Sequence, residues 1–407
     1  MTRFPMPFAR SPETEFLLGC IRRAKPEELG EISRRNLNWS AVLEKAVQYE
    51  ILPLVHCNVQ RILRDGHVPQ QAAGEIGLKY YQDAVQSIAL NRALRELLLQ
   101  FSRANVPVIV LKGAALGALV YEHFSLRPMR DIDLLVRRED LEAADQALRS
   151  LHYAQEAAPA ARERYEREHH HLAPHVSPDG AVHIELHLDI VPRPERLGIS
   201  IEDLWARSRP FSTEGGTARC FAPEDLLLHA CLHLSYLDCF TGKLRAVWDI
   251  AELLRRFERE LDWDRLLGQT RPCGIERYLY YPLWLAQNLG RAPVPEETMR
   301  ALRRSARIGA LEDRWMKPVI AGAVFEHDFA FLPQWLMEEV CKEFLPAGLS
   351  ARGTGRVLKV LIRRLVASAE RTVSLPRFAV PLYAVLVHPL YLGARAAVRL
   401  ARRAGRV

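Results

Sequence analysis

The sequence lacks the features that mark membrane-spanning, secreted and disulfide-rich proteins. Its 407 residues contain no uncharged apolar run long enough to span a bilayer, which needs about 18 residues. Seven scattered cysteines form no C-x-x-C pair, which argues against a disulfide framework or a zinc ribbon. The N-terminal segment has proline and charge where a signal peptide needs an apolar core. We therefore expect a cytoplasmic protein with reduced cysteines.

The net positive charge of the chain is confined to the segment near its C-terminal end. The overall net charge is +7, but residues 352–407 hold twelve Lys and Arg against the single acid Glu370, a local charge of +11, so residues 1–351 carry −4. Pro376, Pro381 and Pro389 interrupt the most apolar part of this region. We expect packed helices with solvated arginines there. The alternatives are contact with an acidic membrane surface, peripheral to the inner membrane, or with nucleic acid.

The segment 106–138, VPVIVLKGAALGALVYEHFSLRPMRDIDLLVRR, predicts a strand, a tight turn, a helix, a loop and a second strand. Asp131 and Asp133 are two residues apart on the second strand, so their side chains share a face. An isolated D-x-D pair more often marks a solvated strand edge. Here the turn, the apolar strand and the flanking arginines favour a divalent metal, Mg²⁺ or Mn²⁺, between the two carboxylates.

The turn before the helix predicts a phosphate site. Gly113 allows the backbone to approach a ligand, and the amides that open the next helix face an anion with a favourable dipole. Arg127 and Arg130, just before the acidic pair, can add bidentate phosphate contacts. We predict that Lys112, Gly113, Arg127 and Arg130 bind the phosphates of a nucleoside triphosphate.

These motifs resemble a known group of enzymes. LKGAAL, Tyr121 and RPMRDIDLLV are similar to the signature of a bacterial nucleotidyltransferase group in the DNA polymerase β superfamily, and IELH, LLLHACLH and VWDIA extend the resemblance over about residues 40–260. The resemblance implies an α+β fold, with a small mixed β-sheet flanked by helices. It also implies transfer of a nucleoside monophosphate from an NTP, in the first place ATP, to an acceptor, with release of pyrophosphate.

A third carboxylate is predicted on the strand expected at residues 181–190, AVHIELHLDI. The alternation of this segment places Glu185 and His187 on one face. Enzymes of the resembled superfamily take a third carboxylate from a neighbouring strand, and Glu185 occupies the matching position. The resemblance therefore implies Asp131, Asp133 and Glu185 as catalytic metal ligands, with His187 orienting the site or contacting the acceptor. The alternative is the polar face of a half-exposed strand.

The remaining segments predict mostly helices. We divide the chain into an N-terminal helical region (1–105), an α/β core (106–195), a helical acceptor-side domain (196–300) and a helical basic region (301–407). In the resembled family the helical part binds the acceptor, which makes Lys243 and Asp249 acceptor-side candidates. His229 and His233 have helical spacing, for which packing or substrate contact is expected. Three adjacent histidines, 169–171, lie in a charged segment and are expected to be solvated.

One departure from the superfamily leaves the function open. Ala114 follows Gly113, where the superfamily usually has Ser or Gly, so a hydroxyl contact to phosphate is missing. The first hypothesis is an active metal-dependent nucleotidyltransferase with an unidentified small-molecule or macromolecular acceptor. The second is a catalytically weak or inactive nucleotide-binding or partner-binding protein that retains the fold. The third, a nucleic-acid-modifying enzyme, is supported only by the basic C-terminal region.

Overall fold

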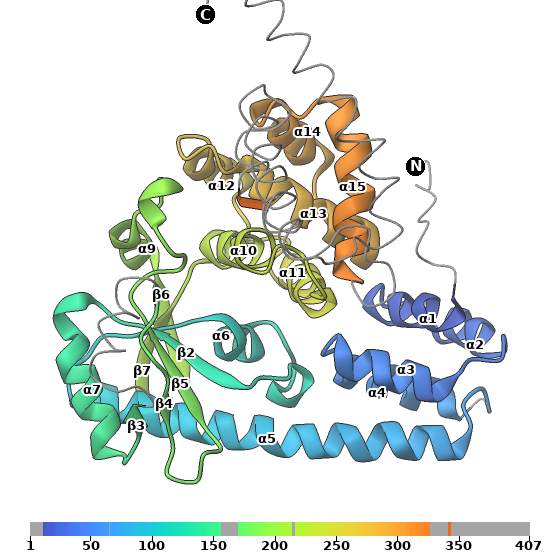
Figure 1. Ribbon diagram of the computed structural model, residues 1–407, viewed down its shortest axis with the longest axis horizontal. Helices are drawn as coiled ribbons and strands as arrows, with labels where there is room; N and C mark the ends of the chain where they lie inside the picture. Colours follow the sequence, from blue (N-terminus) through green and yellow to red (C-terminus); the bar gives the residue numbers. More distant parts are fainter. Residues whose placement is uncertain (1–10, 65, 156–169, 214–215, 326–340, 343–407) are drawn as a thin grey trace, which may run out of the picture. The chain divides into compact units, whose positions relative to one another are not determined.

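The computed structural model describes residues 11–64, 66–155, 170–213, 216–325 and 341–342 (Figure 1). The chain divides into two compact units, Met1–Pro333 and Gln334–Val407, and all described residues except Cys341 and Lys342 lie in the first. The predictions for residues 352–407 concern a segment outside the described residues. Among the described residues, no helix has both the length and the apolarity needed to cross a membrane.

The N-terminal part of the first unit is helical, as the apolar spacing predicts. Ser11 accepts a hydrogen bond from the Thr14 amide at the start of the first helix, and Asn38 caps the third helix through the Ala41 amide. The predicted core stripe of the longest helix is buried, with Leu90, Leu94, Leu97, Leu98 and Phe101 at most 1% exposed. The helices are α1 (Pro12–Ile21), α2 (Pro26–Ser33), α3 (Trp39–Gln48), α4 (Leu52–Leu63) and α5 (Gln70–Arg103).

A mixed sheet forms the centre of the described part. Its seven strands have the order β3-β4-β5-β2-β1-β7-β6. The central strand β2 pairs parallel with β5 and antiparallel with β1. Ile132, Leu134, Ile184 and Leu186 are fully buried, so the apolar faces of β2 and β5 pack into the core. The strands are β1 (Ile109–Val110), β2 (Asp131–Leu135), β3 (Ala154–Gln155), β4 (His175–Val176), β5 (His183–His187), β6 (Arg209–Thr213) and β7 (Gly216–Cys220).

The hairpin β6–β7 interrupts the region 196–300, which the sequence predicts as mostly helical. It extends the sheet because β7 pairs parallel with β1. Phe211 and Ala218 are paired across the hairpin and buried, whereas the intervening residues are mostly polar. Two strands this short and polar carry little hydrophobic periodicity, so their pairing depends on the open edge of β1.

Helices cover the sheet and form a second layer beside it (Figure 1). The helix α5 contacts β2, β7 and α7, while α10, α11 and α13 pack against one another. The prediction of an α+β fold with a mixed sheet flanked by helices is confirmed. The remaining helices are α6 (Lys112–Leu119), α7 (Leu141–Ser150), α9 (Ile201–Arg207), α10 (Pro223–Leu232), a π-helical turn (His233–Leu237), α11 (Leu244–Arg256), α12 (Trp263–Thr270), α13 (Glu276–Gly290), α14 (Glu296–Ser305) and α15 (Ala310–Val324).

Candidate functional site

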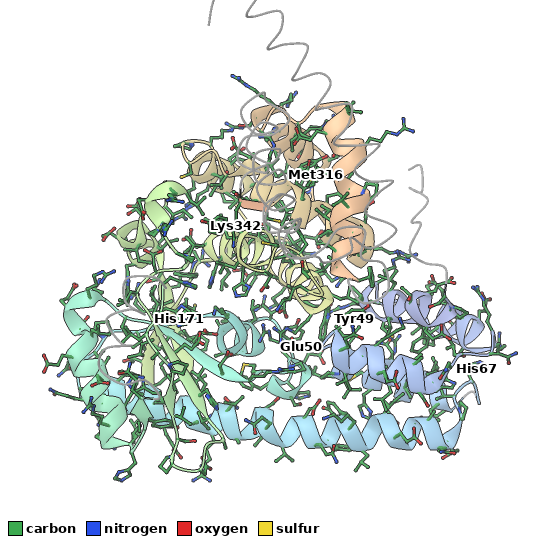
Figure 2. All side chains as sticks on the ribbon, in the orientation of Figure 1. Tyr49, Glu50, His67, His171, Met316 and Lys342 are labelled. Carbon is green, nitrogen blue, oxygen red and sulfur yellow. The ribbon has the colours of Figure 1, made fainter. Side chains whose placement is uncertain are left out.

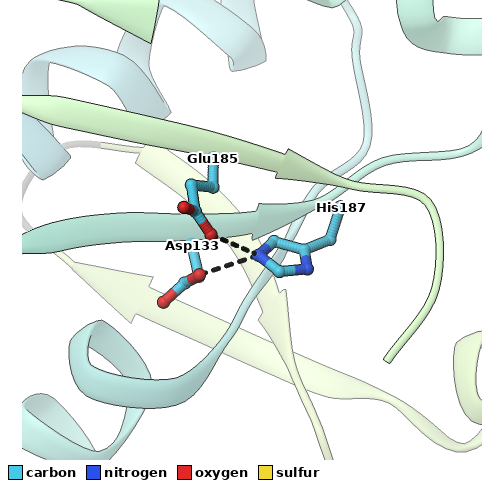
Figure 3. A group of neighbouring side chains, drawn as sticks. All are labelled: Asp133, Glu185 and His187. Atoms are coloured by element: carbon cyan, nitrogen blue, oxygen red, sulfur yellow. Dashed lines mark hydrogen bonds and ion pairs between the residues drawn. The ribbon is translucent and has the colours of Figure 1, made fainter. Parts of the chain in front are cut away.

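The parallel pairing of β2 and β5 brings two acidic side chains together. Asp133 lies opposite Glu185 in the ladder, and His187 follows two residues later on the same face. His187 Nε2 lies 2.7 Å from Asp133 Oδ1 and 3.4 Å from Glu185 Oε2 (Figure 3). Lys112, the first residue of α6, places its Nζ 2.8 Å from Asp133 Oδ1 and 3.9 Å from Glu185 Oε2. The Lys112 ammonium and the His187 imidazole therefore both contact the carboxylates of Asp133 and Glu185, which together with Asp131 we call the acidic cluster.

The protonation states of the cluster follow from burial and neighbouring charge. Burial raises the pKa of Asp133, but the Lys112 ammonium and the hydrogen bond from His187 outweigh it, so this pKa lies well below its ordinary value. Burial lowers the pKa of His187, and its hydrogen bonds to Asp133 and Glu185 reverse the shift and raise it. Asp131 differs, because burial and then the charges of Asp133 and Glu185 raise its pKa.

The acidic cluster fits a divalent cation. Asp133, Glu185 and His187 each offer one ligand atom, and these atoms lie within 4.8 Å of one another. Carboxylate oxygens suit Mg²⁺ and Mn²⁺, and an imidazole nitrogen suits Mn²⁺ better than Mg²⁺. The sequence left two roles for His187, orienting the site or contacting the acceptor. The structure places it fully buried against Asp133, which fits the orienting role, and its sequence signal is the i+2 spacing from Glu185.

A cavity of about 240 Å³ lies beside this cluster, between the α/β core and the helices α10 and α11. Asp131 and Asp133 line it from β2, and His229 and His233 line it from the helical side. Glu185 and His187 are absent from this lining and lie next to Asp133. The other predicted site residues on its wall are Lys112, Gly113, Arg127, Arg130, Lys243 and Asp249.

Arg127 and Asp249 were predicted to contact phosphate and acceptor, but the structure pairs them with each other. The Arg127 guanidinium donates to both Asp249 oxygens, with Nη2 3.0 Å from Oδ2 and Nε 3.2 Å from Oδ1. The Tyr121 hydroxyl donates to Asp249 Oδ1 at 2.7 Å. Arg127 is 6% exposed and Asp249 is 4% exposed. Because a buried charge needs a partner, we interpret this pair as structural.

Gly113 has a packing role beside the predicted phosphate role. A Cβ atom at this position would collide with Arg127 Nη1 and lie 2.9 Å from Met129 Sδ. The absence of a side chain therefore makes room for the Arg127 guanidinium. The unusual backbone belongs to Lys112, whose φ of 41° is uncommon for a residue other than glycine. This conformation begins α6 with the Lys112 ammonium beside the acidic cluster.

Two cations at the cavity, Arg130 and Lys243, have exposed side chains, whereas a third, Arg245, is mostly buried. The Arg130 side chain is 83% exposed and lies 3.1 Å from Glu50 Oε1. The Lys243 side chain is 40% exposed, with its Nζ 3.4 Å from Asp238 Oδ1. Arg245 also contacts Glu50, at 2.7 Å. Exposed ion pairs of this kind contribute little stability, so Arg130 and Lys243 can exchange their partners for an anionic ligand.

Buried and half-buried histidines surround the acidic cluster, and sequence reasoning missed most of this arrangement. His229 is 4% exposed, its Nε2 has no hydrogen-bond partner among the described residues, and burial keeps its pKa well below the ordinary value. His171 forms a β-bridge with His187, and the rings of His170 and His187 lie 5.2 Å apart. The expectation of solvated histidines is wrong for His170 and His171, while residue 169 lies outside the described residues.

Comparison with known proteins gives one matching family and solved structures that are similar to part of the chain. An antigenic nucleotidyltransferase-like protein from Paracoccidioides brasiliensis is 16% identical, with 47% of this chain and 91% of that chain covered and a TM-score of 0.31. JHP933 from Helicobacter pylori is 13% identical, with 55% and 91% covered and a TM-score of 0.27. No curated protein matches the sequence. The family described as uncharacterised nucleotidyltransferase matches residues 35–291, more than half of the chain. The protein therefore belongs to this family of uncharacterised nucleotidyltransferases.

Proposed function

We propose that the protein is a metal-dependent enzyme that transfers the nucleoside monophosphate group of an NTP, in the first place ATP, to an acceptor. The observation that carries this proposal is the in-register pairing of Asp133 with Glu185. Asp133 follows Asp131 by two residues, and both line a cavity whose wall also carries Arg130 and Lys243. In the reaction, an acceptor oxygen forms a bond to the α-phosphorus, the bond to the β-phosphate oxygen breaks, and pyrophosphate leaves. Family membership supports the transferase class.

Each residue of the site has a role that its position supports. Asp131, Asp133 and Glu185 would hold Mg²⁺ or Mn²⁺, which supplies charge stabilisation for the phosphoryl group when it is bound. His187 holds the Asp133 and Glu185 carboxylates in place through its hydrogen bonds to both. A cation bound there would also lower the pKa of the acceptor hydroxyl, so that its proton can leave to solvent.

The cations of the cavity would bind the triphosphate. Lys112 already neutralises Asp133, and its Nζ is close enough to the cluster to contact a phosphoryl oxygen. Arg130 and Lys243 lie at the wall of the cavity with exposed side chains, where they can neutralise the leaving pyrophosphate. In this proposal Arg127 supports the wall through Asp249 instead of contacting the nucleotide.

The test is a search for a labelled product. The protein is incubated with each α-labelled NTP, Mg²⁺ or Mn²⁺ and a cell extract, and a labelled acceptor is expected with at least one nucleotide. Glu185→Gln should abolish labelling while NTP affinity, measured by calorimetry, stays within about tenfold, roughly 1.4 kcal/mol. Glu139→Gln, at an exposed acidic side chain remote from the ladder pair, is the matched control and should keep activity. Labelling that survives Glu185→Gln would refute the assigned role.

A second candidate is a nucleotide-binding protein with weak or no turnover. Two observations favour it: Ala114 offers no hydroxyl to phosphate, and Lys112 with His187 satisfies the acidic cluster without a metal. This candidate predicts NTP binding without any labelled acceptor. Absence of both binding and labelling would exclude both candidates.

A further inference from the structure

The long helix α5 has an apolar stripe on its solvent side. Leu78, Tyr81, Val85 and Ile88 are 64%, 63%, 67% and 64% exposed, although large apolar side chains elsewhere on α5 are mostly buried. Their spacing of three, four and three residues is the a/d spacing of helices that pack along a common seam. Figure 1 shows α5 along one edge of the first unit, and Figure 2 shows side chains projecting outward from it.

The stripe is unusual for this molecule. Scattered apolar side chains on a surface need no explanation, but a continuous stripe on one helix face indicates an interaction site. Other exposed large apolar residues of the described part are Val47, Leu99 and Leu311, and none of them forms a comparable row. At 1.5 Å per residue, the stripe from Leu78 to Ile88 is about 15 Å long, which matches a contact between two helices.

We propose that the stripe binds a second copy of this chain, with α5 packed antiparallel against α5 of the partner across a two-fold axis. In a two-fold contact, residue i meets residue j and residue j meets residue i. An axis between Tyr81 and Val85 places Tyr81 against the partner's Val85 and Leu78 against the partner's Ile88. All four apolar side chains of each copy are then covered.

Charge complementarity selects the antiparallel direction. Glu75 and Arg92 are exposed and lie about one turn beyond the two ends of the stripe. In the antiparallel contact each Glu75 lies opposite the partner's Asn91, one residue from the partner's Arg92, whereas a parallel contact would place like charges together. Both side chains have weak local partners that they can exchange: Glu75 accepts from Gln71 at 3.0 Å, and Arg92 lies 3.0 Å from Glu96.

The proposal is tested on the full chain by sedimentation over a concentration series. The wild type should show a reversible monomer–dimer equilibrium, because a single helix pair is a small interface. Val85→Glu should raise the dissociation constant at least tenfold, because it buries a charge opposite the partner's Tyr81. Leu311→Glu alters an equally exposed apolar residue on α15 and should leave the equilibrium unchanged. A monomer at every concentration, or a dimer that tolerates Val85→Glu, overturns the proposal.

A charge exchange tests the direction separately. Glu75→Arg and Arg92→Glu should each weaken the dimer, and the double variant should restore it, because each copy of a two-fold dimer then carries both exchanged charges. Circular dichroism of each variant checks that the fold is kept. If the single variants weaken the dimer and the double variant weakens it further, the antiparallel contact is wrong.

Discussion

Removing the carboxylate of Asp249 should destabilise the protein strongly. Asp249 lies on α11 and Arg127 follows the 3₁₀ turn Phe124–Leu126, so their ion pair joins the helical layer to the core. Both side chains are almost fully buried, and the Tyr121 hydroxyl binds the same carboxylate. Asp249→Ala leaves the Arg127 guanidinium buried without its counter-charge.

The expected cost follows from that uncompensated charge. Loss of one partner of a buried ion pair costs about 3–5 kcal/mol of unfolding free energy. Tyr121→Phe removes a single hydrogen bond to a charged group and should cost about 1.5–3 kcal/mol. The double variant Arg127→Met/Asp249→Leu removes both charges and keeps similar volume, so most of the stability should return.

Urea unfolding followed by tryptophan fluorescence, with NTP calorimetry on each folded variant, measures both effects. Asp249→Ala is expected to have the lowest midpoint, Tyr121→Phe an intermediate one and the double variant the highest of the three. The double variant should also retain NTP binding if Arg127 only supports the cavity wall. A stable double variant that has lost NTP binding would refute this reasoning and return Arg127 to the phosphate role.

Three further outcomes are expected. Gly113→Ala should lower the unfolding free energy by about 1–3 kcal/mol, because its methyl group collides with Arg127. Gly74→Ala, in open space on α5, is the control that should keep its stability. Equal melting temperatures of the two variants would contradict the packing argument. Burial lowers the pKa of His229, so below about pH 6.5 the unfolded chain binds a proton that the folded chain does not. The free energy of unfolding therefore decreases as the pH decreases. His229→Leu should reduce that slope between about pH 7 and 5 by at most ~1.4 kcal/mol per pH unit, and an unchanged slope in urea titrations would exclude this role. Mn²⁺ should raise the melting temperature of Lys112→Met more than that of the wild type, because a bound cation replaces the lost ammonium. Equal shifts in melting temperature would show that the lysine does not occupy the cation site.

The sequence by itself determined the features that depend on local periodicity. The two-residue period of a strand places Asp131 with Asp133 and Glu185 with His187, and the structure has both segments as strands with their apolar residues buried. The helical period likewise predicts the buried stripe of α5. These features need only the chain's own spacing, since the side chains involved are neighbours along one strand or helix.

Tertiary structure alone decided which distant groups meet. The parallel ladder between β2 and β5 sets Glu185 against Asp133, and the pair of Arg127 with Asp249 joins residues 122 positions apart. Periodicity places a charge on a face but does not identify its partner across the fold. Once Arg127 is buried its charge must be compensated, and the geometry of α11 brings Asp249 to it. For the same reason His171 reaches His187 from a charged segment whose residue types indicated solvent.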